Sequence, residues 1–186
     1  MKKILLFLIF ILAFSGCAKK ETLSQVTSSN PVFFENKPQN KSVFVDIKNS
    51  STLNADLQNL ISKNLYEKGY SLSKEKLASS VVKGDFNFFE TPYKNNQNVF
   101  MNVGFGVGSG GYSSSGLGIG MIFGDSSNDK KPIFGQIALN LTVKTKGKNE
   151  THSTVLNLKT SEQDEAKAAE IFAKKIADKI DMFLNF

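Results

Sequence analysis

Two residue types that serve as catalysts or metal ligands occur only once each. Cys17 is the only cysteine and His152 the only histidine of the 186 residues. A structural zinc site usually takes four cysteine or histidine ligands, and a catalytic triad would have to be built on His152 alone. Cys17 has no partner for an internal disulfide. The sequence therefore predicts no metal site. The remaining role for the single cysteine is to carry an attached group.

Other patterns that carry chemistry in enzymes are incomplete in this chain. GYSSSG at residues 111–116 lacks the G-x-S-x-G spacing and does not join an apolar strand to a helix. GVGSGG at residues 106–111 matches G-x-G-x-x-G, but it leads into a polar turn, whereas dinucleotide binding needs a helix. The candidate acids lie on different predicted elements: Asp46, Asp56, Asp85 and Glu90. We therefore expect no enzyme activity and no dissociable cofactor.

The residues before Cys17 indicate export. Two lysines, an apolar run over residues 4–14 and two small residues precede the cysteine. This is the three-part layout of a secretory signal, and the run is shorter than the roughly 20 apolar residues of a transmembrane helix. LAFSGC at residues 12–17 resembles the lipobox of bacterial lipoproteins. The alternative is an ordinary signal peptide followed by a chance cysteine.

The resemblance to a lipobox implies how the chain is processed. Cleavage would fall between Gly16 and Cys17 and remove residues 1–16 as the signal peptide. The Cys17 thiol would receive a diacylglycerol, and the new amino group a further acyl chain such as palmitate. Two or more chains anchor stably because each buried methylene contributes about 0.8 kcal/mol. Ala18 follows the cysteine in place of an aspartate, which in the usual sorting pattern implies the bacterial outer membrane.

The charge of the chain argues against nucleic acid as a partner. The formal net charge of +6 falls to +4 once Lys2 and Lys3 leave with the signal peptide, and every basic residue is a lysine. Lysine lacks the guanidinium fork that reads phosphates and bases, and the lysines here are dispersed among acids and form no basic stripe. The charge then serves solubility or, alternatively, a weak attraction to anionic lipid headgroups.

Composition and periodicity predict the elements of the first half. Residues 17–41 are rich in polar residues and contain two prolines, which predicts a lipidated tether. KSVFVDIKNSS at residues 41–51 alternates with period two and predicts a strand. Apolar residues at spacings of three and four over 53–65 predict an amphipathic helix that ends before Gly69. Two further strands are predicted at residues 70–72 and 80–90.

The second half predicts an antiparallel strand pair and a helix. The segments at residues 132–147 and 151–160 both alternate, which favours two strands of the same sheet. Thr160 or Ser161 is positioned to cap a final helix whose first turn is acidic. Two helices on one face of a mixed sheet give an α+β fold, a two-layer sandwich over residues 42–186.

The middle of the chain, about residues 98–125, is rich in glycine and lacks charge. No charged residue occurs between Lys94 and Asp125, and apolar side chains alternate with glycines in two runs separated by a polar turn. The length of each run is close to that of a tilted membrane-crossing strand, which is roughly 9–11 residues. We therefore predict an inserted glycine-rich apolar hairpin that associates with the membrane. Its predicted membrane or oligomer residues are Val103, Gly104, Phe105, Gly106, Val107, Gly108, Gly116, Leu117, Gly118, Ile119, Gly120, Met121 and Phe123.

Two other hypotheses for this segment stay open. Glycines four apart, as at Gly104 and Gly108, are also typical of membrane helices that pack closely, and the segment can equally be a surface loop. A single hairpin in lipid would leave unpaired backbone groups along its edges. The hairpin hypothesis therefore requires several copies of the chain to close together, which predicts a homo-oligomer.

Taken in order, the lipobox, the strand at residues 41–51, the helical LNADLQNLISKNLYEKGYSLS at residues 53–73 and the glycine-rich middle resemble the TraT family. The likeness is best over residues 42–90 and continues mainly by element order. It implies an outer-membrane lipoprotein that forms a homo-oligomer with the glycine-rich segment in the membrane. The implied activities are surface exclusion, which blocks redundant conjugation, and complement resistance. The implied partners are membrane lipid, further copies of the chain, and envelope or mating-pair proteins.

Two other kinds of lipoprotein share parts of this pattern. An acylated domain with an inserted glycine-rich hairpin is similar to CsgG-like secretion channels, in which hairpins from a ring of subunits make one barrel. A lipid tether is also shared with periplasmic adaptors of the LpoB kind, which need no apolar hairpin. A channel should raise conductance or dye entry, whereas an adaptor should be shielded from protease on intact cells.

Overall fold

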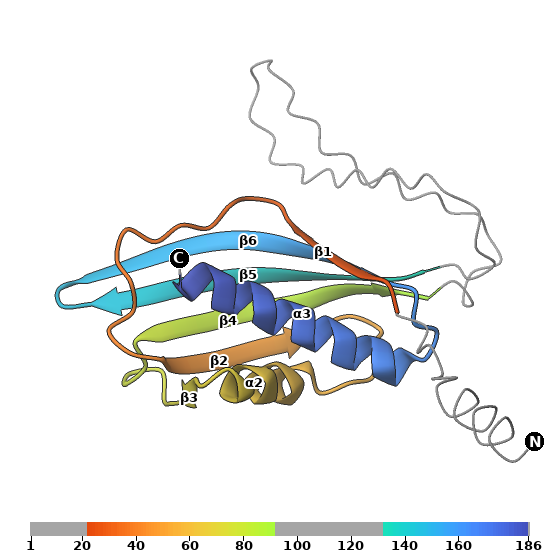
Figure 1. Ribbon diagram of the computed structural model, residues 1–186, viewed down its shortest axis with the longest axis horizontal. Helices are drawn as coiled ribbons and strands as arrows, with labels where there is room; N and C mark the ends of the chain where they lie inside the picture. Colours follow the sequence, from red (N-terminus) through yellow and green to blue (C-terminus); the bar gives the residue numbers. More distant parts are fainter. Residues whose placement is uncertain (1–21, 92–131, 186) are drawn as a thin grey trace, which may run out of the picture.

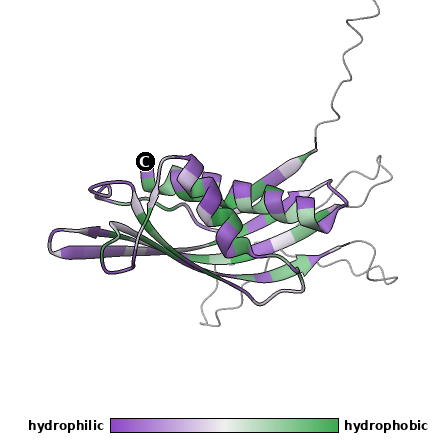
Figure 2. Cartoon of the chain, turned by 90° about the horizontal axis from the view of Figure 1, so that it is seen from below, coloured by the Kyte–Doolittle hydropathy of each residue, from purple (hydrophilic) through white to green (hydrophobic). Residues whose placement is uncertain are grey.

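A six-stranded mixed sheet carries two helices on one of its faces (Figures 1 and 2). This computed structural model describes residues 22–91 and 132–185. The strands are β1 (Ser24–Ser28), β2 (Ser42–Asn49), β3 (Ser71–Leu72), β4 (Ser80–Glu90), β5 (Ile133–Thr145) and β6 (Lys148–Thr160), and the helices are α2 (Leu57–Glu67) and α3 (Glu165–Asn185). The order across the sheet is β1-β6-β5-β4-β2-β3, and only the β2 pairs are parallel. The predicted α+β sandwich of a mixed sheet and two helices is confirmed, while its predicted hairpin insertion lies outside the described residues.

Strict alternation along β5 explains which face of the sheet the helices cover. Ile137, Leu139 and Leu141 are at most 1% exposed and join the core beneath the helices. The residues between them point to the opposite face, which carries no helix. Period-two patterning therefore predicts both this strand and its buried side.

Aspartates cap both helices, which corrects the predicted helix starts. The Asn59 amide donates to the Asp56 carboxylate at 3.0 Å, so α2 begins at Leu57, although Leu53 is also buried. The Lys167 amide donates to Asp164 at 3.0 Å, so α3 begins after Asp164 and the predicted cap at Thr160 or Ser161 is wrong. Before α3, the Glu162 amide donates to the Thr160 hydroxyl, and the Gln163 and Asp164 amides donate to the Glu162 carboxylate, so these amides are bonded by side chains outside the helix.

The N-terminal strand β1 corrects the predicted tether. Ser24 to Ser28 pair antiparallel with Thr160 to Leu156 at the edge of the sheet. Val26 packs against the core, and Val32 is only 3% exposed. The tether predicted over residues 17–41 is therefore wrong from residue 24 onward, because this part of the chain is held by backbone pairing and apolar burial.

The core depends on a close approach of α3 to the sheet at Gly135. The rings of Phe86 on β4 and Phe172 on α3 lie 6.3 Å apart between centroids. A Cβ at position 135 would lie 2.7 Å from Phe86 Cζ and 2.8 Å from Phe172 Cε2. Both phenylalanines are buried, so neither ring has free space to move into.

A polar cluster fixes the C-terminal end of α3 to the end of α2. Tyr70, which is 3% exposed, donates its hydroxyl proton to Asp181 at 3.0 Å, and Asn185 donates to the same hydroxyl at 3.2 Å. Lys68 forms an ion pair of 2.7 Å with Asp178. Burial and, next, the hydrogen bond to Asp181 raise the pKa of Tyr70 well above its usual value.

Gly135→Ala should destabilise the fold because the new methyl group would overlap two buried rings. We expect a loss of about 1–3 kcal/mol in the free energy of unfolding, measured by urea denaturation. Lys146→Ala, in the exposed β5–β6 turn, is the control and should change stability by less than about 0.5 kcal/mol. Equal stability of Gly135→Ala and the parent protein would contradict the close approach of α3.

Tyr70 should make the protein lose stability at alkaline pH. Its folded pKa is raised above its unfolded value, so stabilisation is complete below the unfolded pKa of about 10 and declines as the pH rises further. Tyr70→Phe should remove this alkaline component and lower the stability at pH 7 by about 1 kcal/mol through its lost hydrogen bonds. The measurement is the urea midpoint between neutral and alkaline pH. Tyr66→Phe, at an exposed tyrosine, should retain the alkaline loss; the idea fails if Tyr70→Phe retains it too.

Candidate functional site

One end of the sheet receives the N-terminal segment and both ends of the glycine-rich segment. Leu23 and Ser161 exchange hydrogen bonds, with the Leu23 amide 3.1 Å from Ser161 Oγ and the Ser161 amide 2.9 Å from the Leu23 carbonyl. Thr160 is the register partner of both Ser24 and Ile133. Phe134 in turn pairs with the last residue of β4.

We call this place the junction end: residues 22–24, 90–91, 132–133 and 160–161. It is the right-hand end of the sheet in Figure 1, where β1 begins, β4 ends and β5 begins. The opposite end holds the β5–β6 turn and the C-terminal end of α3. Segments far apart in the sequence therefore meet at one end of the domain.

The residues that the sequence selects for lipid attachment and membrane association lie outside the described residues. Gly16 and Cys17 precede residue 22, and the predicted membrane or oligomer residues, at 103–123, fall within 92–131. They remain predictions. The described residues do show where both segments join the domain, and β4 and β5, which the glycine-rich segment connects, are hydrogen-bonded antiparallel neighbours.

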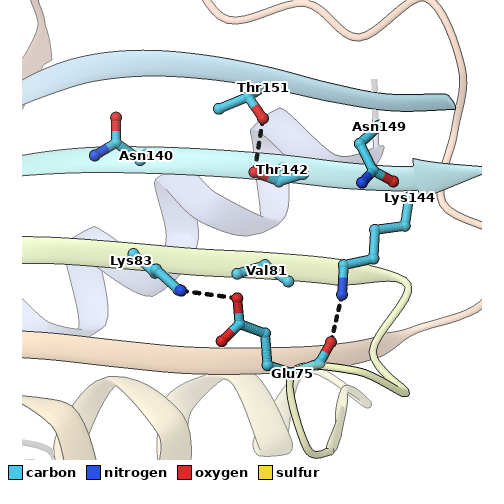
Figure 3. Close-up of a pocket in the computed structure, with 8 residues that line it drawn as sticks. All are labelled: Glu75, Val81, Lys83, Asn140, Thr142, Lys144, Asn149 and Thr151. Atoms are coloured by element: carbon cyan, nitrogen blue, oxygen red, sulfur yellow. Dashed lines mark hydrogen bonds and ion pairs between the residues drawn. The ribbon is translucent and has the colours of Figure 1, made fainter.

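A shallow polar depression of about 290 Å³ lies on the sheet face opposite the helices (Figure 3). Its lining residues are Glu75, Val81, Lys83, Asn140, Thr142, Lys144, Asn149 and Thr151. Lys83 forms a 2.7 Å ion pair with the Glu75 carboxylate, and Lys144 donates to the Glu75 carbonyl. The hydrogen bond from Lys83 holds the pKa of Glu75 below its usual range.

This depression offers hydrogen bonds but no nucleophile with an adjacent base. Its two lysines both bind Glu75, and the hydroxyls of Thr142 and Thr151 bind each other at 2.9 Å. None of these lining residues was a predicted site residue. Alternating polar positions of β5 and β6 are the signal that places them on the uncovered face.

His152, the only histidine of the sequence, makes structural contacts. It lies 2.9 Å from Glu150, and the ring of Phe34 meets its ring edge to face at 4.9 Å. The Glu35 amide donates to both Glu150 oxygens at 3.1 Å. Hydrogen bonds from His152 first, and from the Glu35 amide next, lower the pKa of Glu150. His152 thus helps to hold the segment between β1 and β2 against β6.

The candidate acids lie on different elements, and two of them bind neighbouring groups. Asp56 caps α2, and Asp85 accepts from the Ser50 hydroxyl at 2.7 Å. In residues 22–91 and 132–185, no group of three or more histidine, cysteine or acidic residues is arranged to hold a metal ion. No helix in these two ranges is both apolar and long enough to cross a membrane.

Solved structures resemble this fold only distantly. PelC from Paraburkholderia phytofirmans, solved as a dodecamer, is 11% identical with a TM-score of 0.47, covering 85% of this chain and 97% of its own. A DUF4136 family protein from Bacteroides thetaiotaomicron is 12% identical with a TM-score of 0.39, covering 87% and 97%. Lipoprotein GNA1162 from Neisseria meningitidis is 11% identical with a TM-score of 0.33, covering 76% and 98%. Likenesses of this size carry no argument about function.

Similarity of sequence is more informative. No curated protein matches the chain. A family model described as the enterobacterial TraT complement resistance protein matches residues 22–179, which is most of the chain. The match begins just before β1 and ends in α3, so it covers the whole sheet. The chain therefore belongs to the TraT family.

Proposed function

We propose that this protein is a non-enzymatic lipoprotein of the bacterial outer membrane, anchored through lipid on Cys17 and assembled with copies of itself. Its proposed roles are complement resistance and surface exclusion, both of which protect the cell envelope. The observation that carries the proposal is the family match over residues 22–179.

The geometry of the junction end supports a membrane role. The lipid-bearing cysteine and the apolar glycine-rich segment would both need to reach the bilayer, and both join the domain at the same end. Were they attached at opposite ends, the rigid sheet between them would separate the two membrane contacts. The proposed partners are accordingly membrane lipid, further copies of the chain, and envelope or mating-pair proteins.

A second candidate function, a CsgG-like secretion channel, is favoured by the adjacency of β4 and β5. A segment that connects two hydrogen-bonded antiparallel strands can continue them as a hairpin without any rearrangement of the sheet. Hairpins from several copies could then close into a barrel, which removes their unpaired edges. A periplasmic adaptor of the LpoB kind gains no such support from the strand order.

Cys17→Ala should abolish lipid attachment and leave the protein outside the outer-membrane fraction. The lipid chains attach to this sulfur, and without them the anchoring free energy is lost. Palmitate labelling and cell fractionation are the measurements, with Ala18→Ser as the control that retains the thiol. Normal labelling of Cys17→Ala would show that the anchor lies elsewhere.

A strain without the gene should survive less well in serum or accept more conjugative transfer, and the wild-type gene should restore the phenotype. Cys17→Ala should fail to restore it at equal protein level. If deletion changes neither serum survival nor mating frequency, the proposed role is wrong. Dye entry that depends on the wild-type protein would favour the channel.

The glycine-rich segment should be required for assembly. In mild detergent, size-exclusion chromatography with light scattering should give a large oligomer for the full lipoprotein and a monomer for a form that lacks residues 98–125. A second form, with Gly104, Gly106, Gly118 and Gly120 replaced by bulky polar residues, should also fail to assemble. Monomers in every case would contradict the oligomer hypothesis.

A further inference from the structure

Two loops meet at the end of the sheet opposite the junction end. One is the segment at residues 72–77, which begins at the end of β3, and the other is the β5–β6 turn at residues 144–148 (Figure 1). The Lys144 amide donates to the Ser79 carbonyl at 2.8 Å, and the Lys144 ammonium donates to the Glu75 carbonyl (Figure 3). These bonds hold the two loops side by side, and we call the surface that they form the basic tip.

Lysines are concentrated in the basic tip. It contains five lysines and one glutamate, whereas the rest of the predicted mature chain has equal numbers of lysines and acidic residues. Lys74, Lys76 and Lys146 are exposed and form no ion pair with another described residue. The bonded residues Lys144 and Glu75 are 69 positions apart in the sequence, so only the fold brings these lysines together.

Exposed leucines lie at both ends of the segment at residues 72–77. Leu72 is 52% exposed and Leu77 is 76% exposed. Hydrogen bonds fix the backbone here, since the Ser73 amide donates to the Val43 carbonyl at 2.9 Å and the Leu77 amide donates to the Lys74 carbonyl at 2.9 Å. Both leucines are therefore held in contact with water, which is unfavourable for an apolar side chain. A partner that buries them beside the lysines would gain this free energy.

We propose that the basic tip docks on a lipid layer whose headgroups carry phosphate anions. Lysines are attracted to the negative surface potential of such a layer, and the neighbouring leucines enter the boundary between headgroups and acyl chains. Lysine suits this partner because it is a hydrated point charge that needs no bonds of fixed direction. A protein partner is less suited, because protein interfaces are depleted in lysine. The docking adds a lipid contact away from the junction end and requires no lipid on Cys17.

Vesicle flotation of the unlipidated mature chain tests this docking independently of the anchor. Residues 17–186, produced without the signal peptide, are mixed with vesicles of phosphatidylcholine alone or of phosphatidylcholine with phosphatidylglycerol. We expect more protein to float with the anionic vesicles than with the neutral ones, and this excess should fall as salt is added because ions screen the lysines. Equal flotation with both kinds of vesicle would overturn the proposal and leave an acidic protein as the partner of the basic tip.

Matched lysine variants locate the contact. The tip variant carries Lys74→Gln, Lys76→Gln and Lys146→Gln and should bind anionic vesicles on the order of 100-fold more weakly, about fivefold for each lysine. The control variant has the same change of charge at exposed positions of α2 and α3; it carries Lys63→Gln, Lys167→Gln and Lys174→Gln. The control should bind much more tightly than the tip variant, and circular dichroism checks that both fold. Equal weakening of the two would overturn the basic tip as the docking surface.

A single tryptophan reports whether the apolar part of the basic tip enters lipid. The chain contains no tryptophan, so Leu77→Trp introduces one fluorophore at an exposed apolar position. Its emission should shift to shorter wavelength when anionic vesicles are added, and the same protein with neutral vesicles is the control. Unchanged emission of Leu77→Trp on anionic vesicles that bind the protein would overturn the insertion of this side chain.

Discussion

The approach of α3 to the sheet at Gly135 is the contact on which the rest of the fold depends. Phe172 can lie against Phe86 only because position 135 has no side chain. With the helix at this depth, its far end brings Asp181 to Tyr70, which lies between α2 and β3, and α3 also packs against α2. The same helix contacts β1 and β6, which closes the core on the side where the chain enters.

The parts of the fold that follow from local patterns were predictable from the sequence. β5 alternates strictly, and α2 and α3 repeat their apolar residues at helical spacing, because one side of each faces the core. β1 was missed because SQVTS has little apolar character and is held by pairing with residues more than 120 positions away. Periodicity within a short window carries no information about such a partner. Cap positions were missed for a related reason, since several neighbouring polar residues compete to bond the same amides.

The candidate site also has a part that the sequence predicts and a part that only the fold shows. The prediction for Cys17 comes from a contiguous motif and needs no fold, whereas the junction end exists only after β1, β4, β5 and β6 have been placed in one sheet. His152 shows the reverse case, because its residue type suggests chemistry while its contacts with Phe34 and Glu150 show a packing role. Residue type alone therefore did not reveal the packing role of His152, and the topology of the sheet was needed to bring the segments of the junction end together.

The pairing of β1 with β6 also constrains the order of folding. A chain that is synthesised from its N-terminus presents β1 long before the last strand of the sheet, so β1 has no native partner until nearly all of the domain has emerged. Contacts between such distant residues form late because the loop between them must close first. A strand with the sequence SQVTS tolerates that delay, since a strand with a single apolar residue, Val26, is a poor template for aggregation. The low apolar content that hides β1 from sequence analysis is thus also the property that protects this segment while it has no partner.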